Sequence, residues 1–130
     1  MNIGDKIPEI LGTDQNGNEI KASDFKGKKV ILFCYPKANT PGCTAEACSL
    51  QQHKEELAKK GYSIIGVSKD KQSAQLKFAE NHHLEFPLIA DTETTLLQTL
   101  GCWGEKVFCG KKTIGTLRTT YLINEEGVIE

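Results

Sequence analysis

The chain has 130 residues, of which 38% are hydrophobic and 25% charged, and its formal net charge is −1. This length and composition are typical of one globular domain with a single core, which excludes a two-domain protein. The near-neutral charge offers no basic stripe for nucleic acid or for an anionic membrane surface, so we expect a small molecule or another protein as the partner.

The five cysteines are too few for a disulfide scaffold, and their odd number leaves at least one thiol free. The N-terminus lacks a signal-peptide pattern, and the longest apolar run, Val30–Tyr35, is too short to cross a bilayer. We therefore expect a cytoplasmic protein. In a reducing compartment, neighbouring cysteines are more often catalytic, redox-active or metal-binding than structural.

The first half of the chain predicts a turn, a strand and a long helix. Asn16-Gly17 is a turn signal within a short hairpin, and the apolar run of Lys29–Tyr35 predicts a strand buried on both faces. Thr40-Pro41 is a helix start signal, and helical spacing continues to Gly61 as one helix of about five turns.

Shorter elements are expected in the second half. Strands are predicted over residues 62–67, 87–90, 106–108 and 116–123, helices over 70–81 and from Asp91 to Leu100, and a loop over 110–115. In the 70–81 helix, Leu76 and Phe78 supply the apolar contacts. Alternating strands and helices need crossover connections, so the order predicts an α/β fold with parallel strand pairs and both sheet faces covered.

Cys43 is the strongest candidate for chemistry, because it follows Thr40, Pro41 and Gly42 in the first turn of the predicted helix. Unpaired backbone N–H groups and the helix dipole stabilise a thiolate there. Gly42 leaves the backbone beside the thiol open, and the Thr40 hydroxyl either caps the helix or hydrogen-bonds a ligand. The alternative is a capped helix that carries a buried cysteine.

Cys48 lies five residues after Cys43. In an intact helix this spacing puts the two Cα atoms roughly 8.6 Å apart and about 140° around the axis, beyond the roughly 7 Å limit for a disulfide. The helix must therefore unwind before the two thiols can pair, which would make its start a redox-driven two-state element. Without pairing, Cys48 is a core residue of an apolar helix face.

Two charged residues could influence the thiol of Cys43, one by direct contact and one by orienting the first. Arg118 lies in a β-prone stretch, where a guanidinium needs an anion or water, and a thiolate would suit it. Glu46 would oppose a thiolate if it faced Cys43, so its plausible role is to orient Arg118. Alternatively, both side chains are simply exposed to solvent, Arg118 on a strand and Glu46 near a helix start.

The remaining cysteines and histidines show neither a C-x-x-C pair nor zinc-site spacing. Cys34 is expected to pack in the core, while Cys102 and Cys109 lie in a loop-rich stretch and could compete with Cys48 for an oxidised Cys43. Surface positions or helix ends are expected for the histidines, His53, His82 and His83.

The sequence around Cys43 resembles the active site of the peroxiredoxins. Residues 36–43, PKANTPGC, match their P-x-x-x-T-x-x-C pattern, and residues 43–48, CTAEAC, resemble the bacterioferritin comigratory protein, or PrxQ, subfamily. The resemblance covers almost the whole chain. It implies a thioredoxin-like three-layer fold, with a central mixed sheet flanked by helices, and a thiol peroxidase of antioxidant defence.

The resemblance implies how such a peroxidase would work. Cys43 would attack hydrogen peroxide or an organic hydroperoxide and become a sulfenic acid. Cys48 would resolve it as an intramolecular disulfide, which a thioredoxin-like reductant would reopen, as in an atypical 2-Cys peroxiredoxin. No metal or organic cofactor would be required, and the chain would act as a monomer or weak dimer.

Other matching residues would bind the peroxide. Thr40 and Arg118, with backbone N–H groups at the helix start beside Gly42, would hold both oxygens. Pro36 would shield the sulfur from water, and Glu46 would support Arg118.

Two features depart from the family pattern. Cys102 and Cys109 are extra thiols, which leave the identity of the resolving partner open. The family usually continues beyond the position of Glu130 with further strand and a C-terminal helix, so residues 1–130 are expected to form one domain that lacks this end.

Two other functions compete with a peroxidase. A general thiol–disulfide oxidoreductase would reduce protein disulfides without peroxide, but the chain lacks the usual C-x-x-C. A non-catalytic redox sensor or thiol-based metal-binding module would bind metal stoichiometrically or react slowly with peroxide.

Overall fold

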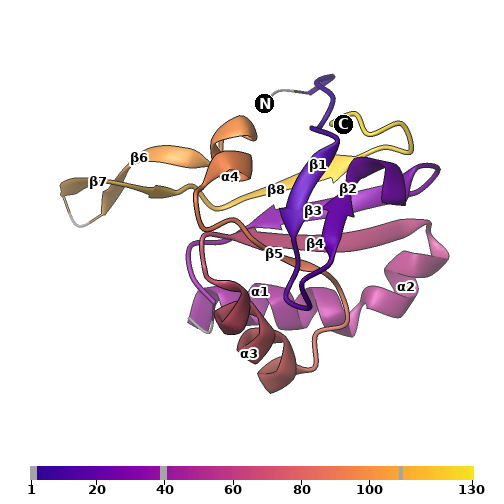
Figure 1. Ribbon diagram of the computed structural model, residues 1–130, viewed down its shortest axis with the longest axis horizontal. Helices are drawn as coiled ribbons and strands as arrows, with labels where there is room; N and C mark the ends of the chain where they lie inside the picture. Colours follow the sequence, from indigo (N-terminus) through magenta and orange to yellow (C-terminus); the bar gives the residue numbers. More distant parts are fainter. Residues whose placement is uncertain (1–2, 39–40, 109) are drawn as a thin grey trace.

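The apolar run at residues 29–35 forms β3 (Lys29–Cys34), the centre of a four-stranded sheet in a computed structural model (Figure 1). The structure describes residues 3–38, 41–108 and 110–130. β3 pairs in parallel with β4 (Tyr62–Ser68), which pairs in parallel with β5 (Leu88–Ala90). β8 (Thr119–Ile123) runs antiparallel on the other side of β3, so the sheet is mixed, in the order β5-β4-β3-β8.

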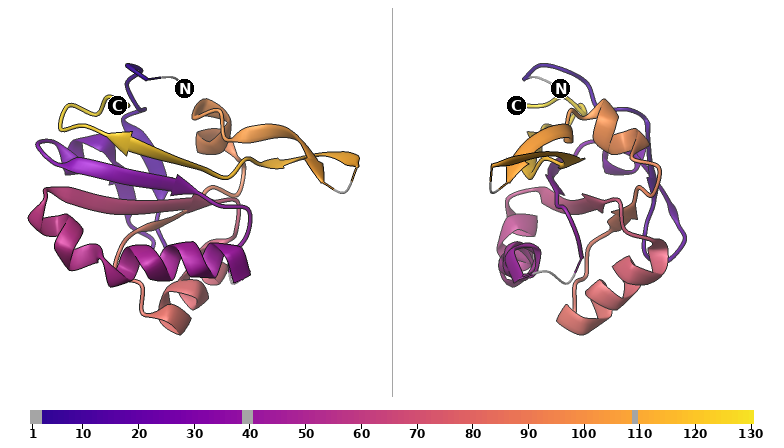
Figure 2. Two further views of the ribbon diagram at one scale, coloured as in Figure 1. Left: turned by 180° about the vertical axis from the view of Figure 1, so that it is seen from behind. Right: turned by 90° about the vertical axis from the view of Figure 1, so that its left-hand side faces the viewer.

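Three helices cover one face of the sheet: α1 (Pro41–Gln52), α2 (Lys54–Lys59) and α3 (Gln72–His82) (Figure 2). Alternate residues of a strand point to opposite faces, and Phe33 of β3 faces this layer. The core between sheet and helices includes Phe33, Tyr35, Cys43, Ala47, Ile64, Phe78 and Leu88.

A hairpin and a short helix cover the opposite face. The hairpin consists of β1 (Ile10–Thr13) and β2 (Glu19–Lys21), followed by a 3-10 turn, η1 (Ala22–Phe25), and the short helix is α4 (Thr95–Thr99) (Figures 1 and 2). The core on this side includes Leu11, Val30, Leu32, Cys34, Ile65, Leu97 and Cys102. Both faces of the sheet are thus covered, as the order of elements predicts.

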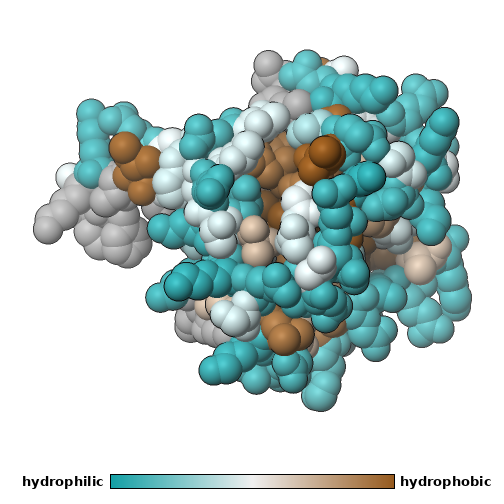
Figure 3. All heavy atoms as spheres, viewed as in Figure 1, coloured by the Kyte–Doolittle hydropathy of each residue, from teal (hydrophilic) through white to brown (hydrophobic). Residues whose placement is uncertain are grey.

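A hollow of about 640 Å³ opens on the hairpin side of the sheet, between η1, the N-terminal segment and residues 123–127. Figure 3 shows hydrophobic residues gathered near the middle of the face that carries β1 and β2, surrounded by hydrophilic ones. Of the chemical candidates that the structure describes, none lines this hollow.

The long helix expected to reach Gly61 is interrupted. His53 adopts φ −100° and ψ 5°, and separates α1 from α2. Its ring Nδ1 lies 2.8 Å from the carbonyl oxygen of Ser49, so a local side-chain contact accompanies the break. The change of direction lets α2 pack against β4, where Leu57 is half-buried.

The expected loop at residues 110–115 is wrong, because most of it belongs to a strand. β6 (Trp103–Phe108) and β7 (Lys111–Thr116) form a separate two-stranded ribbon that projects from the body of the molecule (Figure 1). The strand expected over 116–123 is consequently split, and residues 117 and 118 connect β7 to β8.

The predicted α3 begins two residues late, at Gln72, and its apolar contacts differ in part from those expected. Phe78 is fully buried, but Leu76 is 38% exposed. Gln75 and Ala79 lie with Phe78 on the buried side, because positions three and four apart share one helix face. Among residues 3–38, 41–108 and 110–130, no helix has the length and apolar character of a membrane span.

Candidate active site

Cys43 lies in the first turn of α1, and its side chain is fully buried in the helix-side core. β3 ends at Cys34, and residues 35–38 lead away from the carboxyl edge of the sheet, on the way to α1. Asp70, which follows β4, anchors this connection because its Oδ2 accepts a hydrogen bond from the backbone N–H of Ala38 at 2.8 Å.

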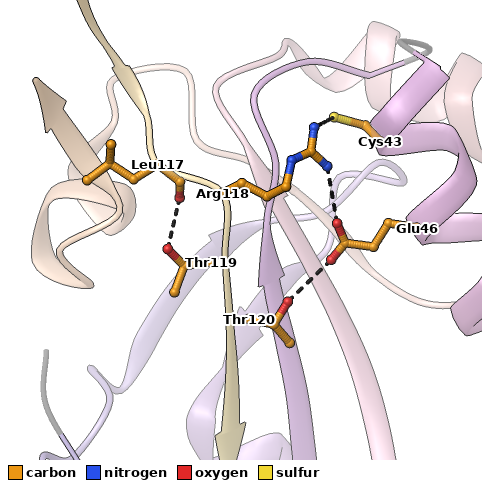
Figure 4. A network of polar contacts seen from close by, with 6 residues as sticks. All are labelled: Cys43, Glu46, Leu117, Arg118, Thr119 and Thr120. Atoms are coloured by element: carbon orange, nitrogen blue, oxygen red, sulfur yellow. Dashed lines mark hydrogen bonds and ion pairs between the residues drawn. The ribbon is translucent and has the colours of Figure 1, made fainter. Parts of the chain in front are cut away.

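Arg118 reaches this thiol from the link between β7 and β8 (Figure 4). Its Nη2 donates to the Sγ of Cys43 at 3.3 Å, although the two residues are 75 positions apart. The link is held by Thr119, whose hydroxyl donates to the carbonyl oxygen of Leu117 at 3.0 Å. The guanidinium is thus aimed at the sulfur by the geometry of the strand junction.

Glu46 holds the other side of the guanidinium. Arg118 Nη1 donates to Glu46 Oε2 at 3.2 Å, and the hydroxyl of Thr120 donates to Glu46 Oε1 at 3.3 Å (Figure 4). Burial by itself would lower the pKa of Arg118, but hydrogen bonds and opposite charge at Cys43 and Glu46 raise it overall. Arg118 is therefore a permanent cation with two anionic neighbours when Cys43 is a thiolate.

Gly42 provides the space that the guanidinium occupies. A Cβ at this position would lie 3.3 Å from Arg118 Nη2 and 3.9 Å from its Cζ. Because 3.3 Å is tighter than ordinary carbon contacts, any side chain here would push against Arg118.

A buried hydrogen-bond network supports the connection between β3 and α1 from behind. The Tyr35 hydroxyl donates to Gln75 Oε1, and Gln75 Nε2 donates to Ser68 Oγ at 2.9 Å. Ser68 Oγ donates to Asp70 Oδ2 at 2.7 Å, which leads back to the N–H of Ala38. Burial is the main cause that raises the pKa of Tyr35, so its hydroxyl stays a donor.

The structure brings together Cys43, Glu46, Gly42 and Arg118 of the predicted site residues. Cys48 lies further along the same intact α1, where its free thiol is half-buried. Pro36 is half-buried in the connection after β3, and Thr40 lies outside the described residues, as does Cys109.

Sequence reasoning missed Thr120 and the Tyr35–Gln75–Ser68–Asp70 network. The alternation of side chains in a strand was a usable signal for Thr120, because residues 118 and 120 point to the same side. The network had no such signal, since Ser68 lies in β4, Gln75 lies in α3, and Tyr35 and Asp70 lie in the connections after β3 and β4. In the described part of the chain, no three His, Cys, Asp or Glu side chains are grouped so that they could hold a metal ion.

Comparison with known proteins identifies the family. The model of the AhpC/TSA family matches residues 3–130. The chain is also 40% identical to Peroxiredoxin Bcp of Escherichia coli K12, over 130 residues that cover 100% of this chain and 83% of that protein. The chain belongs to the AhpC/TSA family of peroxiredoxins. Its resemblance to the Bcp and PrxQ members is thereby confirmed.

Solved structures agree with this peroxiredoxin assignment. The chain superposes on peroxiredoxin Q of Xanthomonas campestris with a TM-score of 0.84 and 30% identity, over 90% of this chain and 74% of that one. With Peroxidoxin BcpB of Mycobacterium tuberculosis the TM-score is 0.85 and the identity 33%, over 99% and 82%. The peroxiredoxin has the expected thioredoxin-like fold and, as a family member, is a peroxidase that reduces peroxide with a cysteine.

Proposed function

We propose that Cys43 is the cysteine that reduces the peroxide. The observation that carries this assignment is the 3.3 Å contact between Arg118 Nη2 and Cys43 Sγ in the first turn of α1. A guanidinium and a helix start both favour a thiolate, which is the nucleophilic form of cysteine. No other described cysteine has a guanidinium within hydrogen-bond distance.

In the proposed first step, the thiolate attacks one peroxide oxygen and the O–O bond breaks. Cys43 becomes a sulfenic acid, and the second oxygen leaves as water or as an alcohol after taking a proton. Arg118 stabilises the negative charge that develops on the leaving oxygen, and Glu46 keeps the guanidinium in place. Gly42 and half of the Arg118 side chain are exposed, so the peroxide reaches the buried sulfur beside them.

Thr40 and Pro36 complete the proposed peroxide site by their match to the family motif. Thr40 would hydrogen-bond the peroxide, and Pro36 would keep water from the sulfur. The substrates are hydrogen peroxide and organic hydroperoxides. Support for the organic class comes from the bacterioferritin comigratory protein of X. campestris, at 27% identity and a TM-score of 0.85, whose structures concern alkyl peroxide reduction.

Cys48 is the proposed resolving thiol. It attacks the sulfenic sulfur of Cys43, so that an S–S bond forms, the S–O bond breaks and water leaves. Both cysteines lie on the same continuous helix, and the first turns of α1 must unwind because five helical positions hold their Cα atoms roughly 8.6 Å apart. Cys102 is a poorer resolving partner, since it lies in the core on the opposite face of the sheet.

A thioredoxin-like dithiol protein then reduces the disulfide by two thiol–disulfide exchanges. Unwinding of this segment would expose the disulfide to the reductant. A disulfide buried within folded α1 would stay out of its reach.

One series of variants tests the proposal. The fully reduced protein, C43S and C48S each receive one equivalent of hydrogen peroxide, and quenched samples are mapped by peptide mass spectrometry. We expect a Cys43–Cys48 disulfide in the unchanged protein, a trappable Cys43 sulfenic acid in C48S and no rapid oxidation in C43S. Retained turnover in C43S would overturn the assignment of Cys43, and a normal turnover rate in C48S would overturn that of Cys48.

The reductant is tested separately by coupling turnover to thioredoxin with its reductase, or to glutaredoxin with glutathione. We expect turnover with thioredoxin, and turnover with the glutaredoxin system alone would contradict this part.

A further inference from the structure

Hydrogen bonds from three elements of the fold converge on the carboxylate of Asp70, just after β4. Gln75 of α3 donates through its Nε2 to Ser68 Oγ and to the carbonyl oxygen of Ile89 in β5, both at 2.9 Å. Ser68, the last residue of β4, donates to Asp70 Oδ2 at 2.7 Å, and its Oγ accepts from the N–H of Asp70 at 3.2 Å. Ser68 and Gln75 are both 0% exposed. The carboxylate is therefore held in one position by β4, β5 and α3.

This carboxylate fixes the chain that leads to the peroxide site. Asp70 Oδ2 accepts from the N–H of Ala38 at 2.8 Å, and Ala38 is buried in the same core cluster as Cys43. Tyr35 is already attached to the sheet, because its N–H donates to a carbonyl oxygen of β4 at 3.0 Å. Pro36, which follows it, has no N–H to offer. The bond to Asp70 thus extends the fixed part of the chain from Tyr35 to Ala38.

The same bond opposes the unwinding that the proposed disulfide needs. Cys43 lies midway between Ala38 and Cys48, five residues from each. In folded α1 the sulfur of Cys43 meets Arg118, whereas pairing with Cys48 requires the start of α1 to unwind. A chain anchored at Ala38 has less freedom to rearrange than one released there, and the charge-assisted bond stabilises only the anchored form.

We propose that Asp70 is a positioning residue that sets the balance between two forms of α1: the folded form, in which Cys43 meets peroxide, and the unwound form, in which Cys48 resolves it. This inference rests on the proposed function and adds to it the group that controls the change of form. Asp70 acts through Ala38 and not on the sulfur itself. Bond making and bond breaking stay those of the proposed cycle, and release of Ala38 accompanies the step from sulfenic acid to disulfide.

Loss of the carboxylate should speed closure of the disulfide and leave the first oxidation nearly unchanged. With Cys43 and Cys48 free, α1 is intact, so the unwound form is the minority. A weaker anchor multiplies this small population and hardly alters the large one. We expect closure about tenfold faster in D70A, as for one charge-assisted hydrogen bond, with Cys43 oxidised at a rate within about twofold of the unchanged protein. D70N keeps an oxygen acceptor without the charge, and should close about threefold faster.

The test measures the rate of Cys43 oxidation and the rate of disulfide closure in the same reaction. Each reduced protein receives one equivalent of hydrogen peroxide and is quenched in acid at increasing times. Peptide mass spectrometry then quantifies the reduced, sulfenic and disulfide forms of Cys43. D14A is the matched control, because Asp14 Oδ1 also accepts two hydrogen bonds, from the N–H groups of Asn16 and Asn18, both at 2.9 Å. These bonds lie in the turn between β1 and β2, away from the chain that leads to α1.

A closure rate in D70A within twofold of the unchanged protein would overturn the proposal. An equal acceleration in D14A would also overturn it, because the effect would then be a general loosening of the fold. A more than twofold loss in the rate of Cys43 oxidation would mean that Asp70 acts on the peroxide site instead. D70N carries the same test if D70A fails to fold, and an unchanged closure rate in it has the same meaning.

Failure of this inference can be told apart from failure of the proposed function. If the unchanged protein forms no Cys43 sulfenic acid and no Cys43–Cys48 disulfide, the proposed function is wrong. If it forms both, and D70A closes at the normal rate, only the role of Asp70 is wrong.

Discussion

Arg118 Nη2 lies 3.3 Å from the Sγ of Cys43, and this contact joins a strand junction to the first turn of a helix 75 residues earlier. The guanidinium uses both terminal nitrogens, because its Nη1 donates to Glu46 while its Nη2 donates to the sulfur. Arginine offers this fork of donors and lysine does not. The contact therefore depends on the shape of the side chain as well as on its charge.

Replacing Arg118 should slow peroxide reduction more than it alters folding. Loss of a single donor to a developing oxyanion commonly slows a reaction by about a hundredfold, so we expect R118A to oxidise at least that much more slowly. R118K keeps the charge but not the fork, and should recover only part of the rate. Stopped-flow measurement of Cys43 oxidation checks this, and an R118A rate within twofold of the unchanged protein would contradict it.

Glu46 should act through Arg118. E46Q removes the charge and leaves a side chain of similar shape, so the guanidinium loses its ion pair and is less firmly aimed at the sulfur. We expect about a tenfold lower rate of peroxide reduction in E46Q, with little further loss when E46Q is combined with R118A. Independent, multiplicative losses in the double variant would show that Glu46 acts by another route.

Replacing Gly42 should lower the rate of peroxide reduction without lowering the stability of the fold. In G42A the new Cβ would lie 3.3 Å from Arg118 Nη2, so the guanidinium must shift by a few tenths of an ångström. We expect about a tenfold slower reaction, while alanine in place of a helical glycine stabilises the fold by up to about 1 kcal/mol.

G104A is the matched control for G42A, because its Cβ would meet only Leu117 Cδ1, at an ordinary 4.0 Å. Rates and urea unfolding of both variants are compared. Equal rates in G42A and G104A would mean that the close approach to Arg118 has no catalytic consequence.

The features that could be predicted from the sequence are those that depend on short local patterns of residues. The apolar run of β3 and the Thr40-Pro41 start signal act over a few residues, so the central strand and a cysteine in the first turn of a helix followed from the sequence alone. The pairing of Arg118 with Cys43 came only as a chemical argument. Its geometry depends on how β8 docks beside β3, which residue spacing does not encode.

The misjudged elements share a physical cause. The break at His53 accompanies the packing of α2 on β4, and the ribbon of β6 and β7 is stabilised by strand pairing between segments without strong alternation. Tertiary contacts override local propensity in both places.

The buried Gln75 should contribute more to stability than its polarity suggests. Its side chain is fully buried, accepts from Tyr35 and donates to Ser68 and to the carbonyl oxygen of Ile89. Q75L has a similar volume but removes all three of these buried hydrogen bonds, so we expect a loss of about 2 to 4 kcal/mol in the free energy of unfolding.

Y35F is the comparison for Q75L. It removes one hydroxyl and one hydrogen bond, and should lose only about 1 kcal/mol. Urea unfolding measures both, and a Q75L variant as stable as Y35F would show that the network is replaced by water or by repacking.

Tyr121 should make stability depend on pH in alkaline solution. Burial, with charge at Cys102, raises the pKa of Tyr121 to about 12, from its ordinary value near 10. The unfolded chain therefore loses this proton first, and the stabilising contribution disappears as the pH rises from about 10 to about 12.

Y121F lacks both this titration and the 2.6 Å hydrogen bond to the carbonyl oxygen of Leu100. We expect Y121F to be less stable by about 1 kcal/mol near neutral pH, and this difference to shrink at alkaline pH. Urea unfolding of Y121F and the unchanged protein at about pH 8 and about pH 11 measures this difference. Lysines and other groups titrate alike in the two proteins, so their contributions cancel in the comparison. A difference that stays constant with pH would mean that Tyr121 ionises equally in the folded and unfolded chain.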